Sequence, residues 1–118
     1  MTTLAGSTSG FADGSALSAQ FDIPYGVATD TVGNIFVSEY NGARIRRIDW
    51  VTRIVSTVAG NGVLAERDGA GTYAEFRNPY ALTMFNGAIW VADMIGGTVR
   101  YISMVKQCGF LRWYSALH

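Results

Sequence analysis

The stretch PYGVATDTVGNIFVSEYNGARIRRID, residues 24–49, carries the clearest structural signal in the sequence. Its runs of Val, Ile, Phe and Thr are short and are separated by Gly, Asn and Asp, as is typical of strands joined by tight turns. Turns of two to four residues join antiparallel neighbours. We therefore predict four antiparallel strands, at residues 25–30, 34–39, 43–49 and, after one more turn, 53–60.

The same pattern returns as PYALTMFNGAIWVADMIGGTVRYIS, residues 79–103. The tetrapeptide Thr3-Leu4-Ala5-Gly6 likewise returns as Thr57-Val58-Ala59-Gly60. An ordered set of matches at one period indicates a repeat architecture. The second copy predicts strands at residues 80–85, 88–93, 98–103 and 107–113.

The repeat predicts the fold class. Four-stranded antiparallel units at a fixed period are typical of β-propeller blades, whose repeats are about 40–50 residues long. We predict an all-β chain that forms two tandem four-stranded antiparallel blades of a partial β-propeller. The expected divisions are the end strand of a preceding blade with a connecting loop (1–24), blade 1 (25–60), an inter-blade loop (61–79) and blade 2 (80–113).

Each connecting segment also contains one candidate helical turn, at residues 14–21 and 71–76. These turns are expected to bury Phe21 and Phe76 beneath the junction of two blades. The glycines beside them supply the conformational freedom that such loops need.

The composition indicates a folded chain without a bulk electrostatic partner. Apolar residues make up 49% of the 118 residues, which excludes intrinsic disorder. Nine basic and nine acidic residues give a net charge of zero. This balance argues against nucleic acid or an anionic membrane surface as a partner.

The sequence predicts neither a signal peptide nor a membrane span. The first residues show neither the basic nor the apolar stretch of a signal peptide. No apolar run approaches the roughly 18 residues of a membrane-spanning helix, so no membrane span is expected. The single Cys108 cannot form an internal disulfide, and the localisation stays open.

The motifs resemble the NHL-repeat β-propeller family. The resemblance rests on four segments: Phe11-Ala12-Asp13-Gly14, Gly26-Val27-Ala28 with Asp30, Gly33-Asn34-Ile35-Phe36-Val37, and Arg44-Ile45-Arg46-Arg47-Ile48. It covers residues 3–60 well and 57–103 less closely. It implies a propeller of about six blades that serves mainly as a binding scaffold, with RNA or protein partners in some members. A related branch contains a metal-dependent lyase.

The sequence also departs from the family pattern. The usual Ala-Asp-x-Gly-Asn after the second strand is replaced by Ser38-Glu39-Tyr40-Asn41-Gly42. Residues 104–118 do not begin a third copy. We therefore expect a piece of about two blades, which self-association or further blades would complete.

Catalytic chemistry is not predicted. The only histidine is His118 and the only cysteine is Cys108, so neither a His-rich zinc site nor a Ser-His or Cys-His pair can form within the repeats. The recurring acids Asp13, Asp30, Asp68 and Asp93 are interpreted as caps of turns rather than calcium ligands. We expect no catalytic residue, no metal and no cofactor.

The arginines are the polar feature with two open interpretations. Arg44, Arg46 and Arg47 lie close together beside Tyr40, and Arg100 repeats Arg46. They could contact a ligand or partner, since arginine beside aromatic rings suits phosphates and bases. Alternatively, they pair with Glu39, Asp49 or another carboxylate within a blade.

The function that we predict is a non-catalytic scaffold for protein binding. The alternative is a piece of a six-bladed lactonase or lyase whose catalytic residues lie on other blades. A protein is the expected partner, and nucleic acid is not expected.

Overall fold

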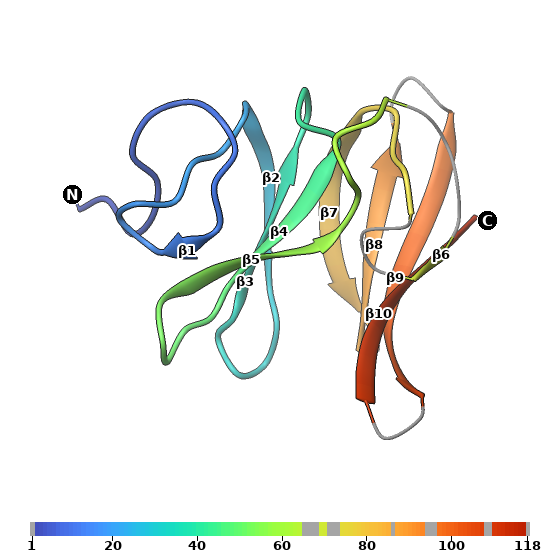
Figure 1. Cartoon of the computed structure of the whole chain (residues 1–118). Coiled ribbons are helices and arrows are strands. Elements are labelled where there is room, and N and C mark those ends of the chain that lie inside the picture. The colour runs from blue at the N-terminus through green and yellow to red at the C-terminus, as the bar shows by residue number, and fades with distance from the viewer. Residues whose placement is uncertain are drawn as a thin grey trace.

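The computed structural model describes residues 2–64, 69–70, 74–85, 87–93, 97–107 and 110–117. Within these residues the chain forms ten strands and no helix. The strands make two five-stranded antiparallel sheets that lie side by side, with the N-terminal segment beyond the first sheet (Figure 1). The predicted all-β class with two antiparallel units is confirmed.

The first sheet contains the strands that the first repeat predicts. It runs β2 (Pro24–Thr29), β3 (Ile35–Glu39), β4 (Arg44–Ile48), β5 (Ile54–Ala59) and β1 (Gly14–Ser15) from one edge to the other. The bounds of β2 to β5 lie within one residue of the prediction. Two-residue β1 was not predicted, because so short a strand has no periodicity to detect.

The second sheet repeats this order. It runs β7 (Pro79–Phe85), β8 (Ala88–Asp93), β9 (Thr98–Gln107), β10 (Phe110–Leu117) and β6 (Gly69–Ala70). Its last two long strands continue beyond the predicted ends at 103 and 113. They pair as one hairpin from Phe110↔Gln107 to Leu117↔Arg100, which the weakened repeat pattern did not show.

The strand register shows that the two sheets are structural repeats. Val27 pairs with Val37 between β2 and β3, as Leu82 pairs with Val91 between β7 and β8. Both pairs of strands also contain a register shift directly after their proline, between Pro24 and Gly26 and between Pro79 and Ala81. A bulge at the same repeat position indicates that both blades bend in the same way.

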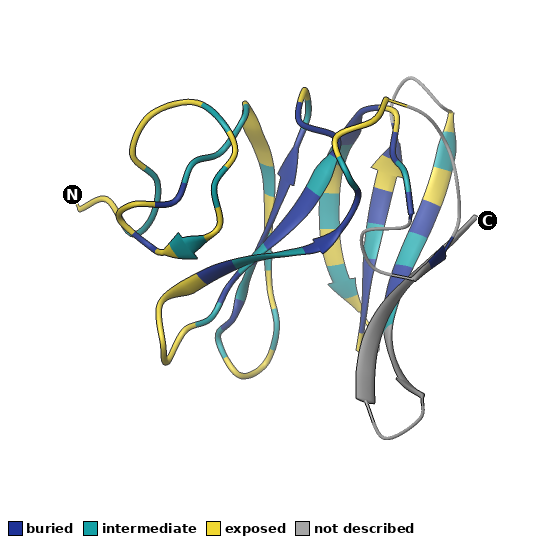
Figure 2. Ribbon diagram, viewed as in Figure 1, coloured by how far each residue is buried: buried dark blue, intermediate teal, exposed yellow. Residues whose placement is uncertain are grey.

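The main core lies between the two sheets. Burial is concentrated where their facing sides meet (Figure 2). Phe36 and Ile45 of the first sheet pack there with Ile89, Val91 and Ile102 of the second. Blade-to-blade packing of this kind buries apolar area that neither sheet could bury alone.

Phe76 completes this core from the connecting segment. Its side chain is fully buried in the inter-sheet cluster, as the sequence predicted. The predicted helical turn before it includes residues 71–73, which lie outside the described residues. At residues 14–21 the chain forms β1 and then a single turn, which is closed by the Ala19 amide donating to Ser15 O at 2.9 Å.

A smaller core covers the other face of the first sheet. Val37 and Ile48 pack there against Leu4, Ala5 and Phe21 of the N-terminal segment. Leu4 and Ala5 are the repeat equivalents of Val58 and Ala59, which cover the second sheet in the same way. The N-terminal segment therefore occupies the place of a preceding blade's outer strand.

Close contact between the sheets depends on Gly26. A Cβ at this position would lie 2.6 Å from the carbonyl oxygen of Tyr80, an approach that side chains do not tolerate. The Ser38 hydroxyl joins the two sheets at the same point, because it accepts from Gly26 N and donates to Tyr80 O, each at 2.8 Å. β2 and β7 thus lie side by side at one end.

Candidate functional site

Arg46 lies in the interior of the first blade. Its side chain is fully buried on β4 and contacts Glu39 at 3.2 Å and Asp13 at 2.8 Å. It also donates to the main-chain oxygens of Ala12 and Gln20, each at 2.7 Å. This set of partners ties the N-terminal connecting segment to the middle of the sheet.

Arg100 occupies the equivalent place in the second blade. It is fully buried, donates to Glu75 O and lies 3.8 Å from the carboxylate of Asp93. Its guanidinium lies over Phe76, 4.4 Å from the ring centroid. Arg46 and Arg100 are therefore buried within the blades, and neither side chain is accessible to a ligand.

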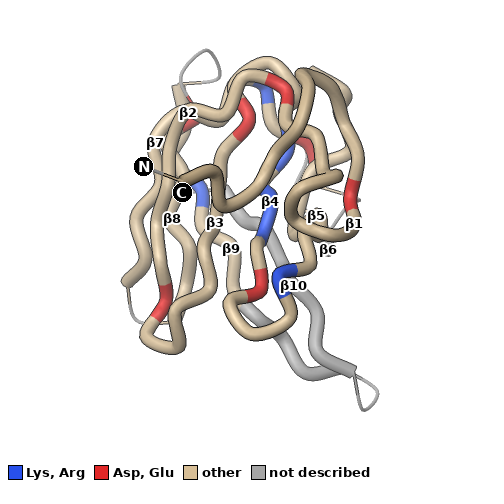
Figure 3. The backbone as a smooth tube through the Cα atoms, turned by 90° about the vertical axis from the view of Figure 1, so that its left-hand side faces the viewer, with Lys and Arg blue, Asp and Glu red and all other residues tan. Residues whose placement is uncertain are grey.

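The other predicted contact residues are more accessible. Arg47 pairs with Asp49 at 3.3 Å, and both side chains are about a quarter exposed. Arg44 lies over the Phe11 ring at 3.8 Å and donates to Asn61 O. The five predicted residues therefore do not form one surface, and basic and acidic positions are interleaved along the chain (Figure 3). Contact of Arg44, Arg47 or Tyr40 with a partner stays a prediction.

The recurring acids have different hydrogen-bond partners. Asp30 caps the β2–β3 turn, because its carboxylate accepts from the amides of Val32, Gly33 and Asn34. Desolvation raises the pKa of Asp30, but the hydrogen bonds from Asn34 and its neighbours outweigh it, so that pKa lies below its ordinary value. Asp13 instead binds Arg46 and the Thr57 hydroxyl, which corrects its interpretation as a turn cap.

Asp93 accepts from two amides, Arg77 N at 2.9 Å and Asn78 N at 2.8 Å. Asp68, Cys108 and His118 lie outside the described residues. Among the residues that are described, no group of three or more His, Cys, Asp and Glu is arranged to hold a metal ion.

Three tyrosines gather where β2 and β7 begin. We call Tyr25, Tyr40 and Tyr80 the tyrosine cluster. The rings of Tyr25 and Tyr80 are 4.1 Å apart and their hydroxyls are 2.6 Å apart, so they share a hydrogen bond. Tyr40 lies 6.0 Å from Tyr25 and 6.3 Å from Tyr80, edge-on to the latter.

The chain on both sides fixes this cluster. The Tyr40 amide donates to Ile23 O at 3.0 Å, and Asn78 of the connecting segment donates to Tyr40 O at 3.1 Å. Ile23 has φ of 52°, a left-handed conformation that is rare for a β-branched residue. The hydrogen bond with Tyr25 raises the pKa of the Tyr80 phenol above its ordinary value.

Sequence reasoning did not identify the tyrosine cluster as a site. The signal was present, because Pro24-Tyr25 returns as Pro79-Tyr80. This repetition indicates a repeat, but it does not show that Tyr40 lies beside Tyr25 and Tyr80. The position of Tyr40 depends on how the two blades pack.

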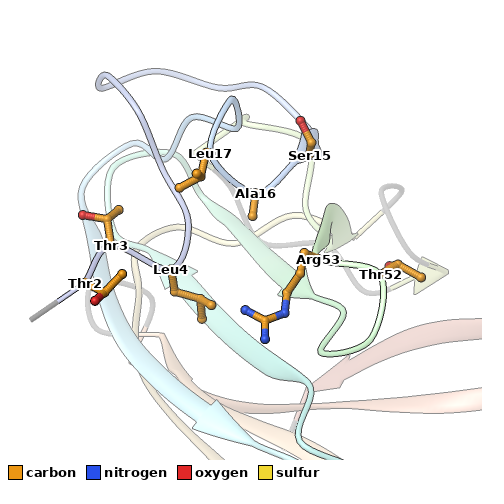
Figure 4. Close-up of a pocket in the computed structure, with 8 residues that line it drawn as sticks. All are labelled: Thr2, Thr3, Leu4, Ser15, Ala16, Leu17, Thr52 and Arg53. Carbon is orange, nitrogen blue, oxygen red and sulfur yellow. The ribbon is translucent and has the colours of Figure 1, made fainter.

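A separate cavity of about 620 Å³ lies between the N-terminal segment and the β4–β5 turn (Figure 4). Its one charged lining residue is Arg53, whose Nε donates to Trp50 O and whose guanidinium lies over the Trp50 ring. The remaining described lining is hydroxyl and apolar: Thr2, Thr3, Leu4, Ser15, Ala16, Leu17 and Thr52. This lining contains no pair of groups suited to acid–base or nucleophilic chemistry.

Comparison with known sequences gives one curated relative. It is Protein SUPPRESSOR OF QUENCHING 1, chloroplastic, of Arabidopsis thaliana, which is 32% identical over 95 residues. The match covers 80% of this chain, and the chain spans 9% of the length of that relative. No protein-family model matches the chain.

Solved structures show the same fold. A structural-genomics protein of unknown function from Bacteroides thetaiotaomicron has a TM-score of 0.73 and 27% identity, over 97% of this chain and 26% of that one. The PQQ-bound aldose sugar dehydrogenase of Streptomyces coelicolor has a TM-score of 0.52 and 13% identity, over 98% of this chain and 33% of that one. Both likenesses support two blades of a β-propeller. In the described residues no helix is long and apolar enough to cross a membrane.

Proposed function

We propose that the chain is a non-catalytic binding module of the NHL-repeat type, and that the tyrosine cluster contacts a protein partner. The observation that carries this proposal is the exposed end of β2, where three tyrosine rings from both blades meet. Tyr25 is 55% exposed there and the neighbouring Ile23 is 51% exposed. An apolar, aromatic surface of this kind favours a protein contact over a charged ligand.

The geometry of the cluster suits binding. Rings that already stack and share a hydrogen bond lose little conformational freedom when a partner covers them. Tyrosine also provides a large apolar area together with a hydroxyl at the rim. The cluster is therefore an ordered surface before any partner arrives.

The surface exists only when the blades are packed. Tyr25 and Tyr40 belong to the first repeat and Tyr80 to the second, and Gly26 and Ser38 hold the two together beside them. This dependence connects the fold to the proposed function, because the partner would recognise a pair of blades rather than one strand.

The NHL-type assignment rests on the sequence motifs and on the propeller fold of the structural neighbours. The enzyme alternative is supported only by the aldose sugar dehydrogenase, whose 13% identity concerns fold alone. The described residues contribute no reactive set to that alternative, whereas the tyrosine cluster is an observation in favour of binding.

Selection from a random peptide display library tests the proposal. Peptides selected on the wild-type chain should bind Tyr25→Ala and Tyr80→Ala at least tenfold more weakly by calorimetry. The control is Trp50→Ala, which removes an aromatic ring that is 45% exposed at a distant turn and should leave binding unchanged. Selected peptides that bind all three variants as they bind the wild type would contradict a role for the cluster.

A further inference from the structure

An apolar cavity of about 400 Å³ lies on the face of the first sheet that is turned away from the second. The N-terminal segment forms one wall and β2, β3 and β4 form the floor. Val27 in this floor is 63% exposed. Its lining includes Leu4, Ala5, Phe21, Val27, Val37 and Ile48.

The equivalent space one repeat later is filled by packed side chains. The repeat equivalents of those six residues are Val58, Ala59, Phe76, Leu82, Val91 and Ile102, and all six belong to or pack against the inter-sheet core. Within that core they surround Phe36 and Ile45 of the first sheet. The open cavity is therefore shaped to receive an aromatic and a branched side chain from the face of another blade.

The second sheet presents such a face. Trp90 and Val99 are the repeat equivalents of Phe36 and Ile45. Trp90 pairs with Tyr101 and Val99 with Ala92 between β8 and β9, so both lie on the face opposite to that of the buried Ile89 and Val91. Val99 is 51% exposed, and the neighbouring Phe85 is 65% exposed. Trp90 stacks on Tyr101 with ring centroids 5.3 Å apart, which holds it in place on this face.

We propose that the chain binds a second copy of itself head to tail, with Trp90 and Val99 of one copy entering the apolar cavity of the other. The two open faces are the two halves of the contact that the chain already makes internally. The residues named on both faces are uncharged, and they have a packed counterpart in the same molecule, which fits another copy of this chain as the partner.

Side-chain sizes agree with this pairing. Trp90 is larger than Phe36, and the cavity has Val27 where the internal core has Leu82. The larger entering ring therefore meets a smaller residue in the floor. Because cores tolerate exchanges that conserve total volume, the substituted pair can pack as the internal pair does.

The second pair of positions shows the opposite compensation. Val99 is smaller than Ile45, and the cavity has Leu4 where the internal core has Val58. A smaller entering side chain therefore meets a larger wall. The two exchanges together keep the volume of the contact close to that of the internal one.

Two other positions make the proposed contact looser than the internal one. Ala81 takes the place of Gly26, so its Cβ would meet the neighbouring main chain where no Cβ fits internally. Ala92 takes the place of Ser38, whose hydroxyl joins the two sheets. We therefore expect weak association, which Ala81→Gly combined with Ala92→Ser should strengthen.

The outer part of the contact is limited by the N-terminal segment. Leu4 and Ala5 already occupy the place of an outer strand, so β7, β8 and β9 of the second copy contact the cavity, and its β10, which pairs with β9, meets the N-terminal segment. Because the two faces differ, the contact is heterologous, and its repetition would close a ring or extend a filament.

A mixing experiment tests the proposal by light scattering and sedimentation equilibrium on the full chain. Wild type should increase in mass with concentration, whereas Trp90→Arg and Val27→Arg should each stay at the monomer mass of 12.8 kDa. Equimolar mixing of these two variants should give a dimer and nothing larger, because each keeps one intact face. Val32→Arg, at a turn residue that is 68% exposed, is the control and should associate like the wild type.

The variant with Ala81→Gly and Ala92→Ser should bind itself at least fivefold more tightly than the wild type. Val99→Arg repeats the test on the entering face if Trp90→Arg does not give the circular dichroism spectrum of a folded chain. The proposal is overturned if the wild type stays monomeric at all concentrations, if a single-face variant associates like the wild type, or if the mixture remains monomeric.

Discussion

The two blades have the same strand order and the same buried arginine, but the buried acid beside that arginine is Glu39 in the first blade and Asp93 in the second. In the first blade, Arg46 contacts both Glu39 and Asp13. In the second, the shorter Asp93 turns to the amides of Arg77 and Asn78 and lies 3.8 Å from Arg100. Both acids hold the connecting segment, since Glu39 also accepts from the Asp22 amide, but Glu39, which is one methylene longer, contacts its arginine at 3.2 Å.

This comparison shows which features a propeller repeat fixes and which it leaves free. The arginine on the third strand and the acid after the second strand recur, because each blade must satisfy the main-chain groups of its connecting segment. The division of hydrogen bonds between them varies. The two blades should therefore respond differently to substitution.

The largest effect is expected for Arg46→Ala. The substitution leaves Glu39 buried without its cation, which should lower the free energy of unfolding by about 3–5 kcal/mol. Arg100→Ala should cost less, since Asp93 keeps two amide partners whereas Glu39 keeps the Asp22 amide. Urea unfolding measures both, with Arg47→Ala as the control at about 0–1 kcal/mol for an exposed pair. An equal loss at Arg46 and Arg100 would remove the distinction between the blades.

Gly26→Ala should cause the next largest loss of stability. The new Cβ would meet Tyr80 O and force the blades apart, at a cost of about 1–3 kcal/mol. Thermal unfolding measures the change, and Thr29→Ala on the exposed side of the same strand serves as the control. A stability equal to that of the wild type would show that the sheets do not approach as closely as the structure has them.

A pH dependence should distinguish Glu39. Desolvation raises the pKa of Glu39 above its ordinary value of 4.5, although the Asp22 amide and Arg46 act against it. The folded chain therefore holds this proton more tightly than the unfolded chain does. Its contribution to stability is present below pH 4.5 and is lost as the pH rises through the folded pKa.

Glu39→Gln should remove that decline from the curve of unfolding free energy against pH. Asp49 provides the opposite sign, because the Thr52 amide holds its pKa below the ordinary value. Its contribution is present above that value and is lost on acidification. A Glu39→Gln curve parallel to the wild type above pH 4.5 would be the contrary result.

The smallest effect is expected in the tyrosine cluster. Tyr25→Phe removes the hydrogen bond that raises the pKa of Tyr80, so Tyr80 should ionise at a lower pH. Ultraviolet difference titration at alkaline pH measures this shift. Tyr101→Phe, in the second blade, should leave the ionisation of Tyr80 where it is in the wild type.

Much of the fold could be predicted from the sequence because its signals are local. Strands β2 to β5 follow from apolar runs between Gly, Asn and Asp, and the burial of Phe76 follows from its place in the connecting segment, where it repeats Phe21. β1 could not be predicted, since two residues pair with β5 only when the connecting segment folds back.

The site could be predicted only in part. The sequence showed that Arg46 and Arg100 are equivalent, but not that both of their strand faces are covered. Their burial depends on Phe11, Phe21 and Phe76, which come from the connecting segments. The tyrosine cluster likewise depends on packing, because Tyr40 meets Tyr80 across 40 residues of chain.

Native-state hydrogen exchange of wild type and Ile89→Ala tests the central claim, which is that the two repeats share one core and fold as one unit. Ile89 belongs to the second sheet and is fully buried against the first. If the two repeats share one core, truncation of Ile89 lowers the protection of the β3 and β4 amides by the same factor as that of the β8 amides. Unchanged protection in β3 and β4, with a loss confined to the second sheet, would contradict it.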